Sequence, residues 1–87
     1  MDRVKDKVIV ITGAASGLGL ADARALANQG AKVVMTDIDT EAGQSHASDI
    51  GATFFTQDVS NEASWDDLMG QIEQQFGRLD GLVNNAG

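Results

Sequence analysis

Three glycines occupy the junction between an apolar run and an alanine-rich stretch, in the segment Thr12-Gly13-Ala14-Ala15-Ser16-Gly17-Leu18-Gly19. The first amides of a helix have no partner inside it, and the positive end of the helix dipole points outward there. An anion is therefore favoured at such a junction, provided that the backbone can come close to it. Glycine allows that approach because it has no side chain. The spacing predicts a loop that holds a phosphate group.

Each member of the loop has an expected part. Gly13 suits the tight exit from a strand, and Gly17, Leu18 and Gly19 would lie under a pyrophosphate. The hydroxyl of Ser16 would reach a phosphate oxygen. The general G-x-G-x-x-G fingerprint is not matched, and the Gly-Lys-Ser/Thr of a P-loop is missing. Ordinary turn glycines, in a chain that has 10 glycines, are the alternative interpretation.

A carboxylate supports the nucleotide interpretation. Asp37 stands at the end of the second apolar run, where dinucleotide-binding folds place an acid that accepts hydrogen bonds from ribose hydroxyls. It would repel the extra phosphate of NADP, and neither Ser16 nor Ile38 offers a positive charge to bind that phosphate. NAD is therefore the predicted cofactor, and Ile38, next to Asp37 in the chain, is an expected cofactor-binding residue. The alternative is that Asp37 only begins the turn Asp-Ile-Asp-Thr, where aspartate is common.

The elements that must position these residues alternate along the chain. Continuous apolar or β-branched runs predict buried strands, and helix-forming stretches that end near glycine predict helices. Either Ser60 or Asn61 would cap the last helix. The expected strands cover residues 7–12, 32–37, 53–57 and 79–84, and the helices cover 18–29, 40–49 and about 61–76.

The order β-α-β-α-β-α-β predicts an α/β fold, a Rossmann-type parallel sheet with helical crossovers. If the fourth strand returns beside the first, the strand order is 3-2-1-4, and a ligand should bind at the carboxyl ends of the strands, where the order reverses. We expect residues 1–87 to form the N-terminal part of a single domain, incomplete at the edge of the fourth strand. Leu79, Leu82 and Val83 should be partly uncovered there.

Four motifs in register resemble the N-terminal part of the short-chain dehydrogenase/reductase family. The glycine loop is similar to the T-G-x-x-x-G-x-G loop of that family, and Asp37 is similar to its NAD-type acid. Asp58-Val59 resembles the Asp-Val pair that closes the third strand. The run Asn84-Asn85-Ala86-Gly87 resembles the Asn-Asn-Ala-Gly run that ends the fourth. The resemblance extends over the whole chain.

The resemblance implies further cofactor contacts. Asp58 would face the adenine amino group and Val59 would pack on the ring, whereas the alternative makes Asp58 a helix cap. Asn85, Ala86 and Gly87 would partly line the ribose of the coenzyme and partly brace the sheet. The family also implies hydride transfer between nicotinamide and an alcohol or carbonyl substrate, and full-length members that form homo-oligomers.

The catalytic groups of that family cannot be placed on this chain. Its Tyr-x-x-x-Lys pair and its Ser lie further downstream, and these 87 residues contain no tyrosine. We therefore name no catalytic residue and expect the chain alone to be inactive. A standalone, non-catalytic nucleotide-binding or assembly module is the alternative to an oxidoreductase. The reading frame beyond Gly87 would discriminate between them.

Composition and charge exclude other classes of function. The net charge of −7 disfavours nucleic acid and anionic membranes as partners. The chain has no cysteine and no apolar stretch long enough for a signal peptide or membrane span, so we expect a cytoplasmic protein. His46 is interpreted as a solvated helix residue. Asp66 and Asp67 favour the start of a helix rather than a metal site, and no metal is expected.

Overall fold

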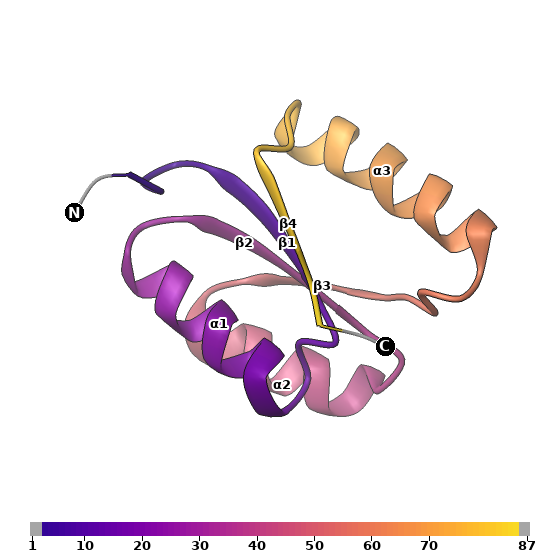
Figure 1. The fold of residues 1–87 in the computed structure, drawn as a ribbon, viewed down its shortest axis with the longest axis horizontal. Helices are drawn as coiled ribbons and strands as arrows, with labels where there is room; N and C mark the ends of the chain where they lie inside the picture. The colour runs from indigo at the N-terminus through magenta and orange to yellow at the C-terminus, as the bar shows by residue number, and fades with distance from the viewer. Residues whose placement is uncertain (1–2, 86–87) are drawn as a thin grey trace.

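The computed structural model describes residues 3–85, which form an open parallel sheet with helices on both faces (Figure 1). The elements follow one another as β1 (Val8–Thr12), α1 (Gly17–Asn28), β2 (Lys32–Asp37), α2 (Thr40–Ile50), β3 (Thr53–Thr56), α3 (Glu62–Phe76) and β4 (Gly81–Asn84). The strand order is β3-β2-β1-β4, and every neighbouring pair is parallel. The predicted Rossmann-type topology is thereby confirmed.

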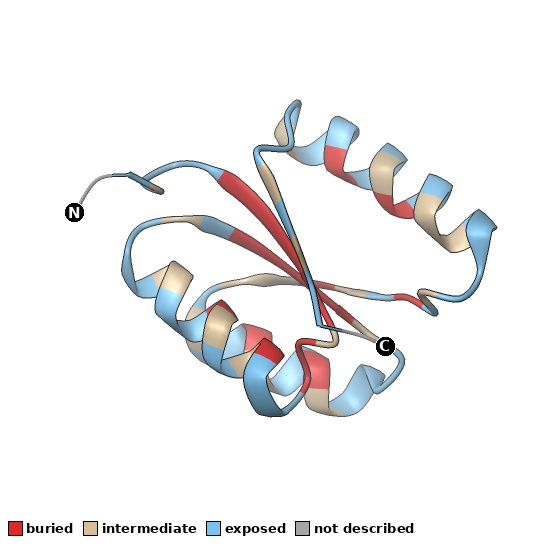
Figure 2. Ribbon diagram, in the orientation of Figure 1, coloured by how far each residue is buried: buried red, intermediate tan, exposed pale blue. Residues whose placement is uncertain are grey.

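The central strand β1 is buried along its whole length, because helices cover both faces of the sheet. Ile9 and Ile11 pack into the core on the side of α1 and α2, whereas Val8 and Val10 pack on the side of α3. Figure 2 shows the buried residues concentrated along β1 and β2 and on the inner sides of the helices. A strand covered on both faces needs a continuous apolar run rather than an alternating one.

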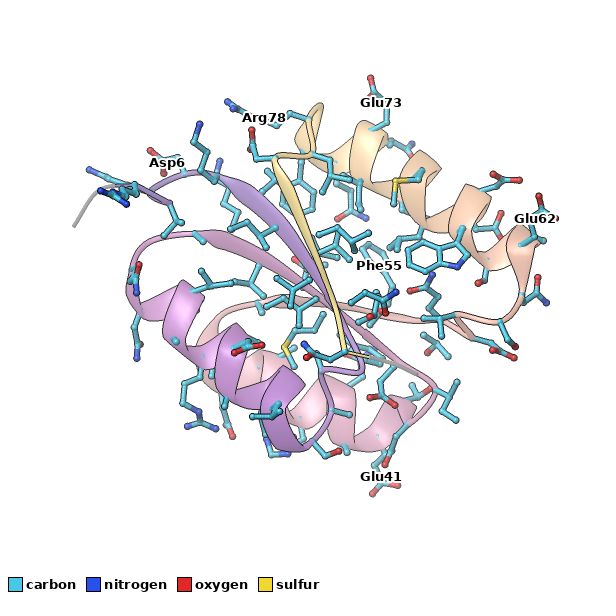
Figure 3. The ribbon with its side chains drawn as sticks, in the orientation of Figure 1. Asp6, Glu41, Phe55, Glu62, Glu73 and Arg78 are labelled. Atoms are coloured by element: carbon cyan, nitrogen blue, oxygen red, sulfur yellow. The ribbon has the colours of Figure 1, made fainter. Side chains whose placement is uncertain are left out.

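The apolar stripe of α3 covers its face of the sheet. Leu68 and Ile72 are buried there, and partly buried side chains surround them: Phe55, Trp65, Met69 and Phe76. Figure 3 shows Phe55 between the sheet and α3, while Glu62 and Glu73 point outward. Asn61 is the residue that caps this helix, because its side chain accepts hydrogen bonds from the amides of Ala63 and Ser64.

On the opposite face, α2 comes unusually close to β3. A Cβ atom added to Gly43 would collide with the ring of Phe54, so glycine is needed at this contact. The helix ends at Ile50, one residue further than expected, and Gly51 caps it with a left-handed φ of 73°. This close packing fixes the position of β3 and of the residues that follow it.

Three strand boundaries differ from the prediction, and the first difference is that β1 begins at Val8 rather than at residue 7. β3 ends at Thr56, so Gln57 lies after the strand. β4 begins only at Gly81, although Asp80 is already bonded to β1: its amide donates to the carbonyl of Val8 and its carboxylate accepts from the amide of Val8, both at 2.8 Å. At this edge Leu79 is 39% exposed and Leu82 is 49% exposed, as expected for an outer strand.

Candidate functional site

A cavity of about 520 Å³ opens at the carboxyl ends of the strands. Its size is typical of small-molecule sites, and its place beside the β1–β4 reversal is where open α/β sheets bind ligands. The lining residues come from the β1–α1 loop and the first turn of α1, from the end of β2 and the residue after it, from the segment after β3, and from the residue after β4. They are Gly13, Ser16, Leu18, Gly19, Asp37, Ile38, Gln57, Asp58, Val59 and Asn85.

Most of the predicted cofactor-binding residues therefore lie around one cavity, although their role in binding stays a prediction. Gly17 is not part of the lining but lies between two residues that are. Ala86 and Gly87 lie outside the described residues. Gln57 also lines the cavity and was not predicted, because the sequence pattern places it inside the third strand.

The backbone of the glycine loop requires glycine at three places. Gly13 and Gly17 have φ values of 62° and 58°, a left-handed conformation that other residues rarely adopt. A Cβ atom on Gly19 would collide with the carbonyl oxygen of Gly13. The start of α1 at Gly19 therefore packs directly against the backbone of Gly13, and this contact leaves no room for a side chain at position 19.

The loop leaves hydrogen-bond donors at the head of α1. Ser16 occupies the N-cap position, but its hydroxyl makes no capping bond. The first bond of the helix runs from the amide of Leu20 to the carbonyl of Ser16 at 3.2 Å. Within residues 3–85, the amides of Gly17, Leu18 and Gly19 have no acceptor. These groups can bind an anion at the positive end of the helix dipole.

Asp37 is tied to this loop from the neighbouring strand. One carboxylate oxygen accepts the amide of Ala15 at 3.1 Å, and the other accepts the amide of Asp39 at 3.0 Å. The carbonyl of Thr36 also accepts the amide of Ala14 at 3.0 Å. An ionised carboxylate has about four acceptor positions, so Asp37 keeps acceptor capacity for a ligand while it anchors the loop.

The carboxylate of Asp58, unlike that of Asp37, stabilises a local turn with Ser60. Its carboxylate accepts both the amide and the hydroxyl of Ser60, at 2.9 and 2.6 Å. These hydrogen bonds, the hydroxyl first and then the amide, hold the pKa of the exposed Asp58 carboxyl below its ordinary value. Asp58 does not cap α3, because Asn61 does. Its carboxylate is thus a fixed negative group at the cavity wall.

The segment around Val59 is held by α3. The indole Nε1 of Trp65 donates to the carbonyl of Val59 at 2.8 Å, and the hydroxyl of Ser64 donates to the carbonyl of Asp58 at 2.6 Å. Both bonds connect a helix side chain to the backbone of the cavity wall. The packing of α3 on the sheet therefore sets the position of this wall.

The remaining wall follows β4. The hydroxyl of Thr12 donates to the side-chain carbonyl of Asn84 at 2.8 Å and accepts the amide of Asn85 at 3.1 Å. The side-chain amide of Asn85 reaches the carboxylate of Asp22 on α1 at 3.4 Å. Asn84 and Asn85 of the run Asn84-Asn85-Ala86-Gly87 thus connect the end of β4 to β1 and α1, as expected of a segment that braces the sheet.

The charge of the cavity is negative. Among the residues that the structure describes, its lining contains the carboxylates of Asp37 and Asp58 and no lysine or arginine. His46, Asp66 and Asp67 do not belong to the lining. Among residues 3–85, no cluster of three or more His, Cys, Asp or Glu side chains is arranged to hold a metal ion. The same part of the chain has no helix long and apolar enough to cross a membrane.

Comparison with known proteins identifies the family. Residues 7–87 match the family model described as short chain dehydrogenase, and the chain belongs to this family. It is 43% identical over 88 residues to 3-beta-hydroxysteroid dehydrogenase of Comamonas testosteroni, covering 99% of this chain and 35% of that protein. It is 42% identical over 90 residues to NADP-dependent (R)-specific alcohol dehydrogenase of Lentilactobacillus kefiri, covering 99% of this chain and 36% of that protein.

A solved structure shows the same fold. The structure described as ribose-5-phosphate isomerase from Brucella melitensis 16M has a TM-score of 0.92 and 34% identity, covering 100% of this chain and 34% of that one. Because one fold serves different activities, this likeness supports the architecture rather than a reaction. The chain spans about a third of the length of the curated relatives described above.

Proposed function

We propose that this chain is the coenzyme-binding portion of an NAD(H)-dependent oxidoreductase, and that residues 1–87 are the N-terminal part of a single NAD-binding domain. The observation that carries the proposal is the joint geometry of the glycine loop and Asp37. Amides without partners lie at the head of α1, and a carboxylate from the next strand is bonded to the same loop at 3.1 Å. A diphosphate joined to a ribose needs such a pair of adjacent groups.

The residues fit the cofactor in order along the sheet. The amides of Gly17 to Gly19 and the hydroxyl of Ser16 would hold the diphosphate, Asp37 the adjoining ribose, and Ile38, Asp58 and Val59 the adenine side. Asn85, Ala86 and Gly87 would adjoin the remaining ribose. The nicotinamide supplies or accepts a hydride when the cofactor is bound. Our assignment of roles to this chain is limited to binding.

The choice of NAD over NADP rests on charge. The extra phosphate of NADP would lie near the ribose, where the cavity presents Asp37 and Asp58 and, within residues 3–85, no cationic side chain. Phosphate next to a carboxylate is repelled unless a positive group intervenes. Family membership leaves this choice open, because the relative from L. kefiri is NADP-dependent.

Isothermal titration calorimetry of the intact protein with NAD and with NADP tests the proposal. We expect NAD to bind and NADP to bind at least about 100-fold more weakly, a difference of roughly 3 kcal/mol. Gly19→Val, which fills the loop next to the Gly13 carbonyl, should abolish binding of both. Gly70→Ala is the matched control, because a Cβ atom there faces open space on α3. Equal binding of both nucleotides, or binding of neither, would contradict the proposal.

The reaction of the intact protein is a further part of the proposal. Its substrate would be a small alcohol or carbonyl compound, and the protein would act as a cytoplasmic homo-oligomer. The dehydrogenase names of relatives that are 42–43% identical support the substrate class. If the intact protein binds NAD but reduces no carbonyl compound and oxidises no alcohol, the non-catalytic nucleotide-binding module is the better account.

A further inference from the structure

A second cavity, of about 160 Å³, lies between β3 and α3 and shares no lining residue with the larger one. Two of its lining residues belong to the strand and four to the helix: Phe55, Thr56, Ser64, Asp67, Leu68 and Gln71. The helix residues follow one another at the spacing i, i+3, i+4 and i+7, so they form one stripe along α3. The cavity is smaller than typical small-molecule sites and has room for a single side chain.

β3 is an edge strand, because its neighbour within residues 3–85 is β2 alone. Gln57, directly after β3, is 3% exposed and its carboxamide has no partner in this part of the chain, but its amide donates to the carbonyl of Asp37 on β2 at 3.0 Å. Backbone groups of successive strand residues point to alternate sides, so those of Phe55 also face β2. Those of Phe54 and Thr56 face outward and have no partner among the described residues. Such an edge can pair with a strand from another chain.

The chemistry of this cavity indicates which side chain it would accept. Phe55 and Leu68 supply apolar walls. The carboxylate of Asp67 is exposed and has no hydrogen bond or ion pair within residues 3–85, and no lysine or arginine of that range lines the cavity. A lysine or arginine side chain is the complement, because its methylene stem packs on apolar surface while its charged end reaches a carboxylate.

The dipole of α3 does not explain the charge of Asp67. A carboxylate stabilises a helix when it lies within about the first turn. Glu62 is the acidic residue of that turn, and Asp67 lies beyond it. The carboxylate of Asp67 is therefore available for an interaction outside its own helix.

We propose that the groove between β3 and α3 is a docking site for an extended, basic segment of a partner protein. The segment would add a strand to β3, with hydrogen bonds to the backbone of Phe54 and Thr56, and would place a lysine or arginine side chain in the cavity beside Asp67. Recognition of this kind takes its affinity from main-chain bonds and its selectivity from side-chain pockets. The net charge of −7 favours the approach of a basic partner.

The test is an NMR titration of the intact, isotope-labelled protein with the acetylated and amidated pentapeptide Thr-Val-Lys-Val-Thr, whose residues favour an extended conformation. We expect the amide signals of Phe54 and Thr56 to shift with saturating behaviour at millimolar peptide. The same peptide with glutamate in place of lysine should bind about fivefold more weakly, which is the size of one partly exposed ion pair.

Asp67→Asn separates the charge of the cavity from its shape. This variant keeps the size of the side chain and should bind the lysine and glutamate peptides with equal affinity. Asp66→Asn is the matched control, because Asp66 is an exposed acid in the same turn of α3 that does not line the cavity. It should keep the preference for the lysine peptide.

Three titration results would overturn the proposal: no saturating shift at Phe54 and Thr56, equal affinity of the wild type for the two peptides, or an unchanged preference in Asp67→Asn. Slow hydrogen exchange at the Thr56 amide without peptide would also overturn it, because another part of the intact protein would then already cover this edge. These outcomes do not depend on NAD binding, so the proposed function is tested separately.

Discussion

Asp37 and Asp58 both place a carboxylate near the carboxyl end of neighbouring strands, yet the two carboxylates have different partners. Asp37 is the last residue of β2, and Asp58 lies two residues after the end of β3. Each carboxylate accepts the amide of the residue two positions on, Asp39 or Ser60. Asp37 additionally reaches the amide of Ala15 in the glycine loop, 22 residues earlier in the chain. Among residues 3–85, the carboxylate of Asp58 bonds only to Ser60, within its own turn.

The difference follows from the order of the strands. β2 lies beside β1, so an acid at its end reaches the loop that leaves β1, whereas β3 is one strand further away. An aspartate near the end of a strand therefore has a different structural role in each case. Asp37 is a half-buried anchor that links two segments, and Asp58 is an exposed carboxylate whose removal should affect only its surroundings.

The largest expected effect comes from Asp37→Ala. This change removes the ribose acceptor and also frees the amide of Ala15, so the glycine loop loses its connection to β2. We expect NAD affinity to fall about 100-fold or more, because hydrogen bonds to charged groups contribute about 1.5–3 kcal/mol each. Calorimetric titration with NAD measures the loss.

Asp39→Ala is the control for that variant. Asp39 caps α2 by accepting the amide of Ala42 at 3.1 Å, and it does not line the cavity. Its loss should cost about 1 kcal/mol of stability while NAD affinity stays the same. Equal losses of NAD affinity in Asp37→Ala and Asp39→Ala would show that Asp37 acts only by holding the turn between β2 and α2, and that it does not bind the ribose.

Asp58→Ala should have a smaller effect. It removes one exposed carboxylate from the part of the cavity proposed to hold adenine, so we expect NAD affinity to fall about tenfold. The glycine loop after β1 should be unaffected. Asp66→Ala, an exposed acid on α3 outside the lining, is the control and should leave the affinity unchanged. If Asp58→Ala weakened binding more than Asp37→Ala, the comparison between the two carboxylates would be wrong.

Trp65→Phe sharpens the comparison by loosening only the wall that carries Asp58. The variant keeps the aromatic packing on the sheet but loses the hydrogen bond from the indole to the carbonyl of Val59. We expect NAD affinity to fall about threefold and stability to fall by about 1 kcal/mol. Chemical denaturation and NAD titration measure the two effects, and an unchanged midpoint of denaturation would show that this bond does not hold the wall.

The smallest effect concerns pH. The hydrogen bonds from Ser60 lower the pKa of Asp58 in the folded protein, so this carboxylate adds stability that is present above its unfolded pKa of about 3.9. The stability is lost as the pH falls through the lower pKa of the folded state. Wild type should therefore lose slightly more stability than Asp58→Asn between about pH 5 and pH 3. Identical losses in thermal unfolding would contradict this.

The topology and the glycine loop were predictable because they depend on local signals. The buried run at Val8–Ile11 and the glycines at 13, 17 and 19 each specify a local conformation, and the strand order follows from the rules of parallel sheets. The bond from Ala15 to Asp37 and the isolation of the Gln57 carboxamide were not predictable. Both depend on how side chains from separate strands meet at the sheet edge.

The account depends most on the amides at the head of α1 holding the diphosphate of NAD. The most direct measurement is an NMR titration of the intact protein with NAD, following the backbone amides of Gly17, Leu18 and Gly19. We predict that these signals shift with saturating behaviour, together with Ala15 and the residues around Asp37. Saturable NAD binding that leaves all of these amides unshifted would contradict the account.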